Sequence, residues 1–308
     1  MLAVFESVDL RSADAVVAAL QAGTRANRSA PCRRGSIDVV EGSEAPPRLI
    51  ATGDLHDNPV HLARAVELAG MADPAGAPGA PGAHLTLHEV IHSDRLVNGV
   101  DLSYAALVRV ALVKAAFPAH CHTLLANHEL AQIVGAGIIK DGANVCALFN
   151  EGVEWVFGGD APRVQAAVGE FIRSMPLALR IVHGPGAPDT LCAHSLPDPT
   201  LMDRFDPSVL ERDLEESDYA PRRGSAHLLV WGRSQRPEQL EFLSRRWNVG
   251  LFLLGHEKAE RGVMLVPPNA VVINSDHADG KYIPLPLDRP TSADLAVALA
   301  ASIAPVPA

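Results

Sequence analysis

The sequence contains few cysteines and comparatively little positive charge. Only four of its 308 residues are cysteine, and none forms a Cys-x-x-Cys pair. We therefore expect reduced, mostly buried thiols in a cytosolic protein and no disulfide framework. Lysine and arginine together number 26 against 36 acidic residues, which gives a net charge of −10. This charge argues against a nucleic-acid partner, because such a surface needs an extended basic patch.

The sequence also lacks a long apolar run. No segment approaches the ~20 consecutive apolar residues of a membrane-spanning helix. The first residues include Glu6, where a signal peptide would carry positive charge. These absences predict a soluble, cytoplasmic protein without a membrane partner. Hydrophobic residues still make up 48% of the chain, which is enough to build a large core.

The hydrophobic pattern predicts an α/β fold whose first half alternates strands with helices and whose second half is rich in strands. Helices are expected over residues 12–21, 60–68, 103–117, 130–175 and about 291–304. Strands are expected over residues 48–52, 84–87, 122–125, 177–183, 190–194, 228–231, 251–254, 263–266 and 271–274. The Pro- and Gly-rich stretch 71–83 is expected to be a flexible surface insertion.

Residue types that bind divalent metals follow the apolar segments at five places. Asp54 and His56 are one residue apart, so their side chains point to the same side of an extended chain. A carboxylate and a neutral imidazole side by side make half of a divalent-metal site. Comparable groups follow later apolar segments, at His88-Glu89, Asn127-His128-Glu129, His194 and His256-Glu257. One such group would be weak evidence, but a series at strand ends predicts a metal site.

The order of these motifs resembles a known family. Gly-Asp-Leu-His at 53–56, Asn-His-Glu at 127–129, a histidine at 194 and Gly-His at 255–256 are similar to the motifs of calcineurin-like metallophosphoesterases. More narrowly, they resemble the PPP branch of phosphoprotein phosphatases. The resemblance implies an α/β/β/α sandwich of two mixed sheets flanked by helices. It also implies a single domain over 1–308, with a catalytic core at about 48–283, an N-terminal helical extension at 1–47 and the C-terminal helix.

The resemblance implies two divalent metal ions that share a carboxylate and a bridging hydroxide. Asp54 and His56 would bind the first ion. The second ion would take Asn127, His194 and His256. Oxygen and imidazole ligands suit manganese, which we favour, or iron or zinc. Two ions ~3.5–4 Å apart can hold a hydroxide for in-line attack on phosphorus and neutralise the phosphate oxygens.

The bridging carboxylate has two candidates, because the family's Gly-Asp-x-x-Asp-Arg-Gly is irregular here. The favoured reading takes Glu89, at the end of an apolar strand, as the bridge. Asp94 would then orient His128, and Arg95 would hold the phosphate with two hydrogen bonds. The rival reading makes Asp94 the bridge and leaves Glu89 within a longer strand. His128 itself resembles the general acid that protonates the leaving alkoxide.

These residues predict a metal-dependent phosphomonoesterase, with phosphoserine or phosphothreonine in a protein as the expected substrate. One alternative is an enzyme of the same fold that cleaves nucleotides or dinucleoside polyphosphates. Another is a degenerate member that binds phosphopeptides without turnover, because the family's His-Gly-Gly is replaced by His194-Ser195-Leu196. Arg233 and Arg236 either line the substrate groove or lie in solvated loops.

Overall fold

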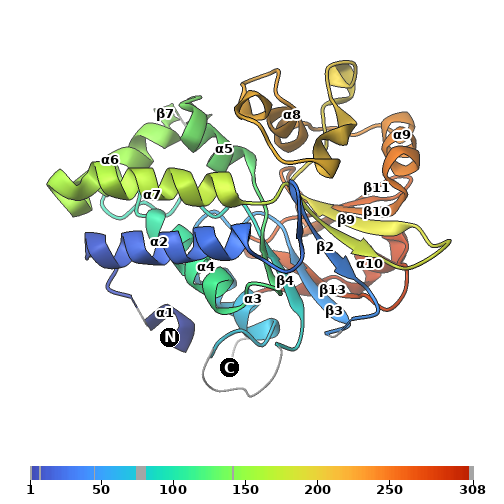
Figure 1. The fold of residues 1–308 in the computed structure, drawn as a ribbon, viewed down its shortest axis with the longest axis horizontal. Coiled ribbons are helices and arrows are strands. Elements are labelled where there is room, and N and C mark those ends of the chain that lie inside the picture. The colour runs from blue at the N-terminus through green and yellow to red at the C-terminus, as the bar shows by residue number, and fades with distance from the viewer. Residues whose placement is uncertain (1, 7, 45, 74–80, 141, 305–308) are drawn as a thin grey trace.

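Two β-sheets form the centre of the molecule in the computed structural model, which describes residues 2–6, 8–44, 46–73, 81–140 and 142–304 (Figure 1). Most of the insertion predicted at 71–83 lies outside these residues. The larger sheet has seven strands in the order β1-β2-β8-β9-β10-β12-β11, and the smaller has five in the order β14-β13-β3-β4-β5. Both sheets mix parallel and antiparallel pairs.

The strands are short. The larger sheet consists of β1 (Arg33–Arg34), β2 (Ile37–Glu41), β8 (Ala178–Val182), β9 (Asp189–Ala193), β10 (Val249–Leu254), β11 (Val263–Val266) and β12 (Ala270–Ile273). The smaller sheet consists of β3 (Arg48–Thr52), β4 (His84–Leu87), β5 (Cys121–Thr123), β13 (Lys281–Pro286) and β14 (Ala301–Ser302). A separate two-stranded hairpin is formed by β6 (Ile139–Lys140) and β7 (Ala143–Asn144).

Helices flank the sheets. They are α1 (Ala3–Glu6), α2 (Ala13–Arg28), α3 (Pro59–Leu68), α4 (Tyr104–Ala116), α5 (Asn127–Val134), α6 (Val145–Phe157), α7 (Ala161–Ser174), α8 (Ser225–Trp231), α9 (Pro237–Trp247) and α10 (Ala293–Leu299). Figure 1 shows α2, α4, α6 and α7 together on one side, where α2 packs on both α4 and α7. Helix α10 contacts β11, β12 and β13. None of the helices within the described residues combines the length and the apolar character needed to cross a membrane.

Alternation along the strands explains how the sheets are covered. In β10, Leu251 and Leu253 join the apolar cluster that also contains residues of β3 and β13 from the other sheet. Phe252 and Leu254 point the opposite way and join the larger cluster that includes the helices. Successive side chains of a strand face opposite sides of the sheet, so one apolar strand serves two cores. Each fully buried side chain of this size contributes about 1.5–3 kcal/mol.

The carboxyl ends of the parallel strands from both sheets meet at one place. In the smaller sheet β3, β4 and β5 run parallel, and in the larger sheet β9, β10 and β12 run parallel. A bridge between Asp54 and Asn274 joins the ends of β3 and β12. Gly53 makes this approach possible, because a Cβ there would collide with the carbonyl oxygen of Ile273. Open α/β sheets bind ligands at such strand ends.

The predicted α/β architecture, with two mixed sheets flanked by helices, is confirmed. The strand predicted at 228–231 is wrong, because these residues form the end of α8. A short apolar run does not distinguish a buried strand from a buried helix. The predicted C-terminal helix is shorter than expected and is followed by β14. The segment 1–47, expected as a helical extension, contributes β1 and β2 to the larger sheet. The four cysteines are free and buried, as predicted.

Candidate metal centre

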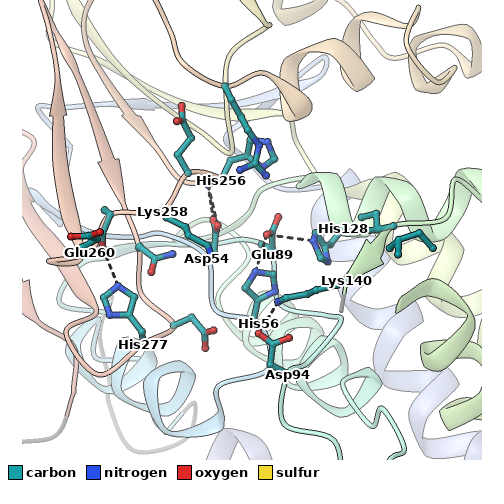
Figure 2. A pocket seen from close by; sticks show the side chains of 17 residues that line it. Asp54, His56, Glu89, Asp94, His128, Lys140, His256, Lys258, Glu260 and His277 are labelled. Carbon is teal, nitrogen blue, oxygen red and sulfur yellow. Dashed lines mark hydrogen bonds and ion pairs between the residues drawn. The ribbon is translucent and has the colours of Figure 1, made fainter. Parts of the chain in front are cut away.

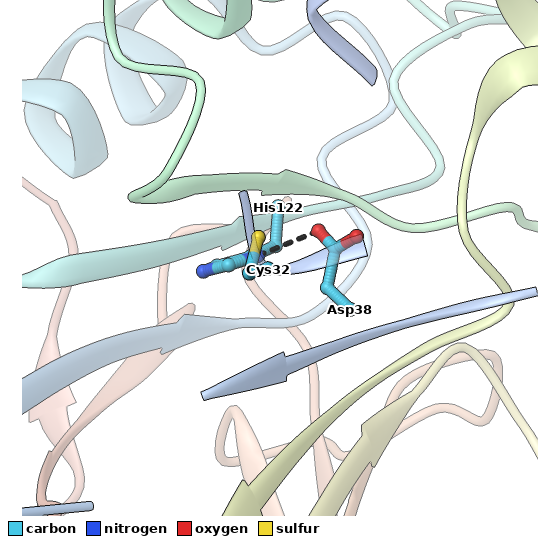
Figure 3. Close-up of side chains that lie close together, drawn as sticks. All are labelled: Cys32, Asp38 and His122. Atoms are coloured by element: carbon cyan, nitrogen blue, oxygen red, sulfur yellow. Dashed lines mark hydrogen bonds and ion pairs between the residues drawn. The ribbon is translucent and has the colours of Figure 1, made fainter. Parts of the chain in front are cut away.

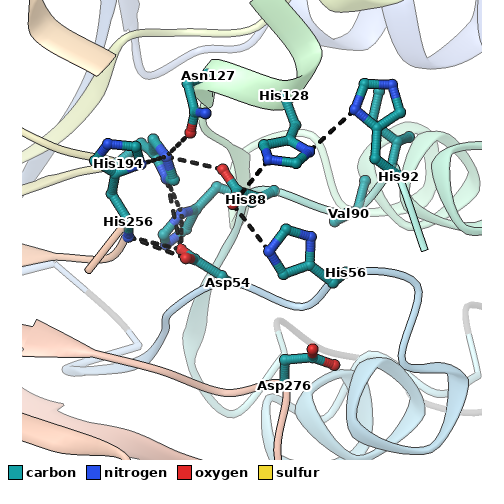
Figure 4. Close-up of polar contacts among 12 residues, drawn as sticks. Asp54, His56, His88, Val90, His92, Asn127, His128, His194, His256 and Asp276 are labelled. Carbon is teal, nitrogen blue, oxygen red and sulfur yellow. Dashed lines mark hydrogen bonds and ion pairs between the residues drawn. The ribbon is translucent and has the colours of Figure 1, made fainter. Parts of the chain in front are cut away.

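Metal-binding residue types gather where the strands end (Figures 2 and 4). Asp54 follows β3, Glu89 follows β4, and Asn127 begins α5 shortly after β5. His194 follows β9 and His256 follows β10, so the larger sheet contributes two imidazoles. A cavity of about 570 Å³ opens at this place. The structure therefore brings the six predicted ligand residues, these five and His56, to one end of the two sheets.

The carboxylate of Glu89 lies between the two sides of the site. Its Oε1 is 3.0 Å from Nε2 of His56, and its Oε2 is 2.9 Å from Nε2 of His194. Strand β4 ends at Leu87, so Glu89 lies in the loop that follows and has a left-handed φ of +48°. A non-glycine residue in this region is costly and persists where its surroundings enforce it. The side chain is 3% exposed and faces the histidines.

Asp54 is held against the loop that follows β10. Its two carboxylate oxygens accept from the backbone N–H of His256 at 2.9 and 3.1 Å. This contact needs Gly255, because a Cβ at that position would collide with Asp54 Oδ1. Asp54 Oδ1 also lies 3.6 Å from Nδ1 of His194 and 3.8 Å from Nδ1 of His88. Asp54 thus lies close to His194 and His256, which follow strands of the larger sheet, and also to His88, which follows β4.

The ring of His194 carries the densest set of contacts. Its Nε2 lies 2.6 Å from Asn127 Oδ1, 2.9 Å from Glu89 Oε2 and 3.2 Å from His256 Nδ1. An imidazole nitrogen carries at most one hydrogen, so one N–H cannot satisfy these three neighbours at once. Lone pairs of oxygen and nitrogen that converge in this way are the donor set of a divalent cation. The residues present therefore fit a metal ion.

The charges at the site are strongly coupled. Burial raises the pKa of Glu89, but the rings of His128, His194 and His56 outweigh burial and hold this pKa well below its usual range. Burial and the charge of Glu89 raise the pKa of Asp54 to about 6. Burial lowers the pKa of His56, yet Glu89 and then Asp54 raise it to about 9. One buried anion thus attracts positive charge from both sides, which favours cations between these ligands.

Glu129 holds the loop in which Glu89 lies, a role that the sequence analysis did not assign to it. Its Oε1 accepts from the backbone N–H groups of Val90 and Ile91 at 2.8 and 3.3 Å. The carbonyl of Glu89 in turn accepts from the backbone N–H of His56 at 2.8 Å. Burial and the charge of Glu89 raise the pKa of Glu129 to about 7. Its position in the Asn-His-Glu motif was the signal that could have identified it.

In the structure, Asp94 and Arg95 contact other groups than their expected roles name, and those roles stay predictions. Asp94 is half-exposed, and its Oδ2 accepts from Lys140 Nζ at 2.6 Å. The ring beside His128 belongs instead to His92, with 3.0 Å between the two Nδ1 atoms. Arg95 donates to the carbonyl of His56 and forms an ion pair with Asp276 at 2.6 Å. Loop length explains the difference in contacts: His92, two residues before Asp94, is the residue that the loop brings next to His128.

Three cations line the cavity with the metal-binding residues. Lys140 comes from the β6–β7 hairpin, and Arg233 and Lys258 come from loops of the second half of the chain (Figure 2). Burial is the main cause that lowers the pKa of His128 and of His256, and the charges of Lys140 and Arg233 respectively act in the same direction. Positive charge therefore flanks the site on both sides. Arg233, whose role the sequence left open, faces the cavity.

A second cluster of Cys32, Asp38 and His122 is buried in the core (Figure 3). Nδ1 of His122 lies 2.7 Å from Asp38 Oδ2, and Lys114 Nζ lies 3.9 Å from the same oxygen. Burial raises the pKa of the Cys32 thiol to about 12, so this sulfur is protonated and a poor metal ligand. Because Lys114 already supplies a buried positive charge, this cluster is a structural network.

Comparison with solved structures identifies the fold. A protein serine/threonine phosphatase from Saccharomyces cerevisiae, with similarity to human phosphatase PP5, matches with a TM-score of 0.63 and 17% identity, over 89% of this chain and 83% of that one. A cold-active protein-tyrosine phosphatase from a Shewanella species matches with a TM-score of 0.53 and 13% identity, over 86% and 82%. No protein-family model and no curated protein sequence matches the chain. The chain has the fold of these phosphatases, which confirms at the level of the fold the resemblance that the motifs predict.

Proposed function

We propose that the protein is a metal-dependent phosphomonoesterase that acts on phosphoserine or phosphothreonine in proteins. The observation that carries this proposal is the position of Glu89, whose two carboxylate oxygens lie 3.0 and 2.9 Å from imidazoles on opposite sides of the site. Asp54 and His56 would hold one divalent ion. Asn127, His194 and His256 would hold the other, and Glu89 would bind both. Manganese is the favoured metal, with iron or zinc as alternatives.

The bound ions would supply a hydroxide nucleophile and neutralise the phosphate oxygens. The chain's own groups would do the rest. Lys140 and Arg233 line the cavity from two sides and would bind the non-bridging oxygens of the phosphate. His128 Nε2 lies 3.9 Å from Glu89 Oε1, at the edge of the ligand set. From there it would transfer a proton to the leaving oxygen, as a positioned imidazole does in general acid catalysis.

The test is a substrate panel on protein stripped of metal and then reloaded with manganese. We expect hydrolysis of p-nitrophenyl phosphate and of phosphoserine or phosphothreonine peptides, and no hydrolysis by the metal-free control. Glu89→Gln should abolish turnover. Glu241→Gln, on the exposed side of α9 where it pairs with Arg245, should leave turnover unchanged and serves as the matched control.

The same panel separates the alternatives. Preferential cleavage of dinucleoside polyphosphates would replace the proposed substrate class with nucleotides. Tight phosphopeptide binding without turnover in any metal would identify a non-catalytic binding protein. Failure of manganese-, iron- and zinc-loaded protein to hydrolyse any phosphoester above the metal-free control would overturn the proposal.

A further inference from the structure

His92 occupies a position in the site that the sequence did not assign to it. It lies three residues after Glu89, is 1% exposed, and places its ring beside His128 with 5.0 Å between the ring centroids (Figure 4). Its φ of +61° is left-handed, and its backbone N–H donates to Ser103 Oγ at 3.0 Å. The ring of Phe149 meets it edge-on. A strained backbone that is fixed by such contacts is typical of residues at functional sites.

Hydrogen bonds on the far side of His92 determine which of its nitrogens carries a proton. His92 Nε2 faces Gln132 Oε1 at 3.0 Å, while the amide nitrogen of Gln132 donates to Asn150 Oδ1 at 2.8 Å. Because an amide oxygen can only accept, His92 Nε2 must be the donor. A neutral imidazole carries one hydrogen, so Nδ1 of His92 is then an acceptor.

The same logic fixes the ring of His128. Its Nδ1 lies 3.0 Å from the accepting Nδ1 of His92. The hydrogen of this contact therefore belongs to His128. In the neutral ring of His128, Nε2 is then left with a free lone pair, and this atom faces the carboxylate of Glu89 at 3.9 Å.

We propose that His92 is a positioning residue that holds His128 in its Nδ1–H tautomer and directs its Nε2 toward the metal centre. This inference rests on the proposed function: the lone pair on Nε2 of His128 would first take up a proton from solvent, and the resulting imidazolium would pass that proton to the leaving oxygen. The chain Asn150–Gln132–His92–His128 gives the catalytic ring one orientation and one tautomer. In other hydrolases an aspartate performs this task for a catalytic histidine; here a neutral ring, itself fixed by an amide, performs it.

The proposal also explains why the half-exposed carboxylate of Asp94 is not needed to orient His128. Asp94 is bonded to Lys140, which lines the cavity, so it is engaged in holding a cation. His92 lies three residues after Glu89 in the sequence, and this spacing places it where it can orient His128. If the role of His92 were purely structural, its ring would contribute only through packing. Packing does not select a tautomer, so the tautomer of His128 separates the two roles.

The first test measures that tautomer directly. In metal-free, ¹⁵N-labelled protein, two-bond ¹H–¹⁵N correlations distinguish an Nδ1–H from an Nε2–H imidazole. We expect the Nδ1–H tautomer for His128 in the wild type. Gln132→Leu removes the acceptor of His92 Nε2 and should shift His128 toward Nε2–H. Gln165→Leu, a second amide at the small cavity next to Gln132, should not, and is the matched control.

The second test uses turnover. His92→Phe keeps a buried ring but removes the acceptor, and kcat for an alkyl phosphate should fall by ~10–10²-fold with KM unchanged, less than the ~10²–10⁴-fold of removing a general acid. His92→Asn restores an acceptor and tolerates positive φ, so it should recover most of kcat.

An Nε2–H tautomer of His128 in the wild type would overturn the proposal, as would wild-type kcat in a folded His92→Phe. If His92→Phe fails to fold, the tautomers of the wild type and of Gln132→Leu decide. If the wild type hydrolyses no phosphoester, the proposed function fails, while the tautomer still decides the inference about His92.

Discussion

Glu89 offers the sharpest test of the site, because its carboxylate is the group that both sides share. Glu89→Gln keeps the shape of the side chain and removes its charge. The side chain is 3% exposed, and both of its oxygens face imidazoles at 3.0 and 2.9 Å. Removing one partner of a buried charge pair typically costs about 3–5 kcal/mol. At 1.4 kcal/mol per factor of ten, this corresponds to about 10²–10⁴-fold weaker metal binding.

The assay is metal stoichiometry by mass spectrometry after dialysis against manganese, together with isothermal titration. We expect two ions per wild-type chain and fewer than one per Glu89→Gln chain. Asp94→Asn is the matched variant, because Asp94 also lines the cavity but is bonded to Lys140; it should retain both ions. The opposite pattern, two ions in Glu89→Gln and a loss in Asp94→Asn, would refute the reasoning and make Asp94 the bridge.

Three further predictions follow from named contacts. His128→Ala should retain both metals and lose ~10²–10⁴ in kcat for alkyl phosphates, but less for p-nitrophenyl phosphate, whose leaving group needs little protonation; an equal loss for both esters would contradict the role of His128. Gly255→Ala should drive a Cβ into Asp54 Oδ1 and destabilise the fold by about 1–3 kcal/mol in urea unfolding, whereas Gly169→Ala, with no atom near its Cβ, should not. Burial, then His122, lowers the pKa of His84 to about 3 from 6.5. Between pH 6.5 and pH 3 the unfolded chain therefore binds more protons at His84 than the folded chain does. The free energy of unfolding should decrease as the pH falls through this range, by up to about 5 kcal/mol. Between pH 7 and pH 4, the free energy of unfolding in urea should decrease less in His84→Gln than in the wild type. An equal decrease in the two proteins would show that His84 does not contribute to the pH dependence of stability.

The features that the sequence predicted depend on local pattern. Apolar runs ending in Asp54, Glu89 or His256 identify both a strand and the residue type at its end, and these strand ends do meet in the structure. The strands predicted at 177–183 and 190–194 are confirmed as β8 and β9, which pair antiparallel. The assignment of individual ligands to the two ions is part of the proposal.

The features that the sequence could not predict depend on contacts between distant segments. Strand β2 was missed although Ile37, Val39 and Val40 are typical of strands, because it is short, lies in a polar stretch and pairs with β8, more than a hundred residues away. The helix α8 covers an apolar run that reads equally well as a strand. His92 was missed for a different reason. The sequence analysis looked for the Asp-Arg pair of the family motif and so selected Asp94. In the structure, the residue three positions after Glu89, which is His92, lies next to His128.

The central claim is that Glu89 joins two divalent ions, one held by Asp54 and His56 and the other by Asn127, His194 and His256. Anomalous diffraction from manganese-loaded crystals, recorded on both sides of the manganese edge, tests this claim most directly. We predict two anomalous peaks ~3.5–4 Å apart, with a carboxylate oxygen of Glu89 bound to each ion. A single peak, two peaks bridged by Asp94, or manganese bound only at Cys32, Asp38 and His122 would contradict the account.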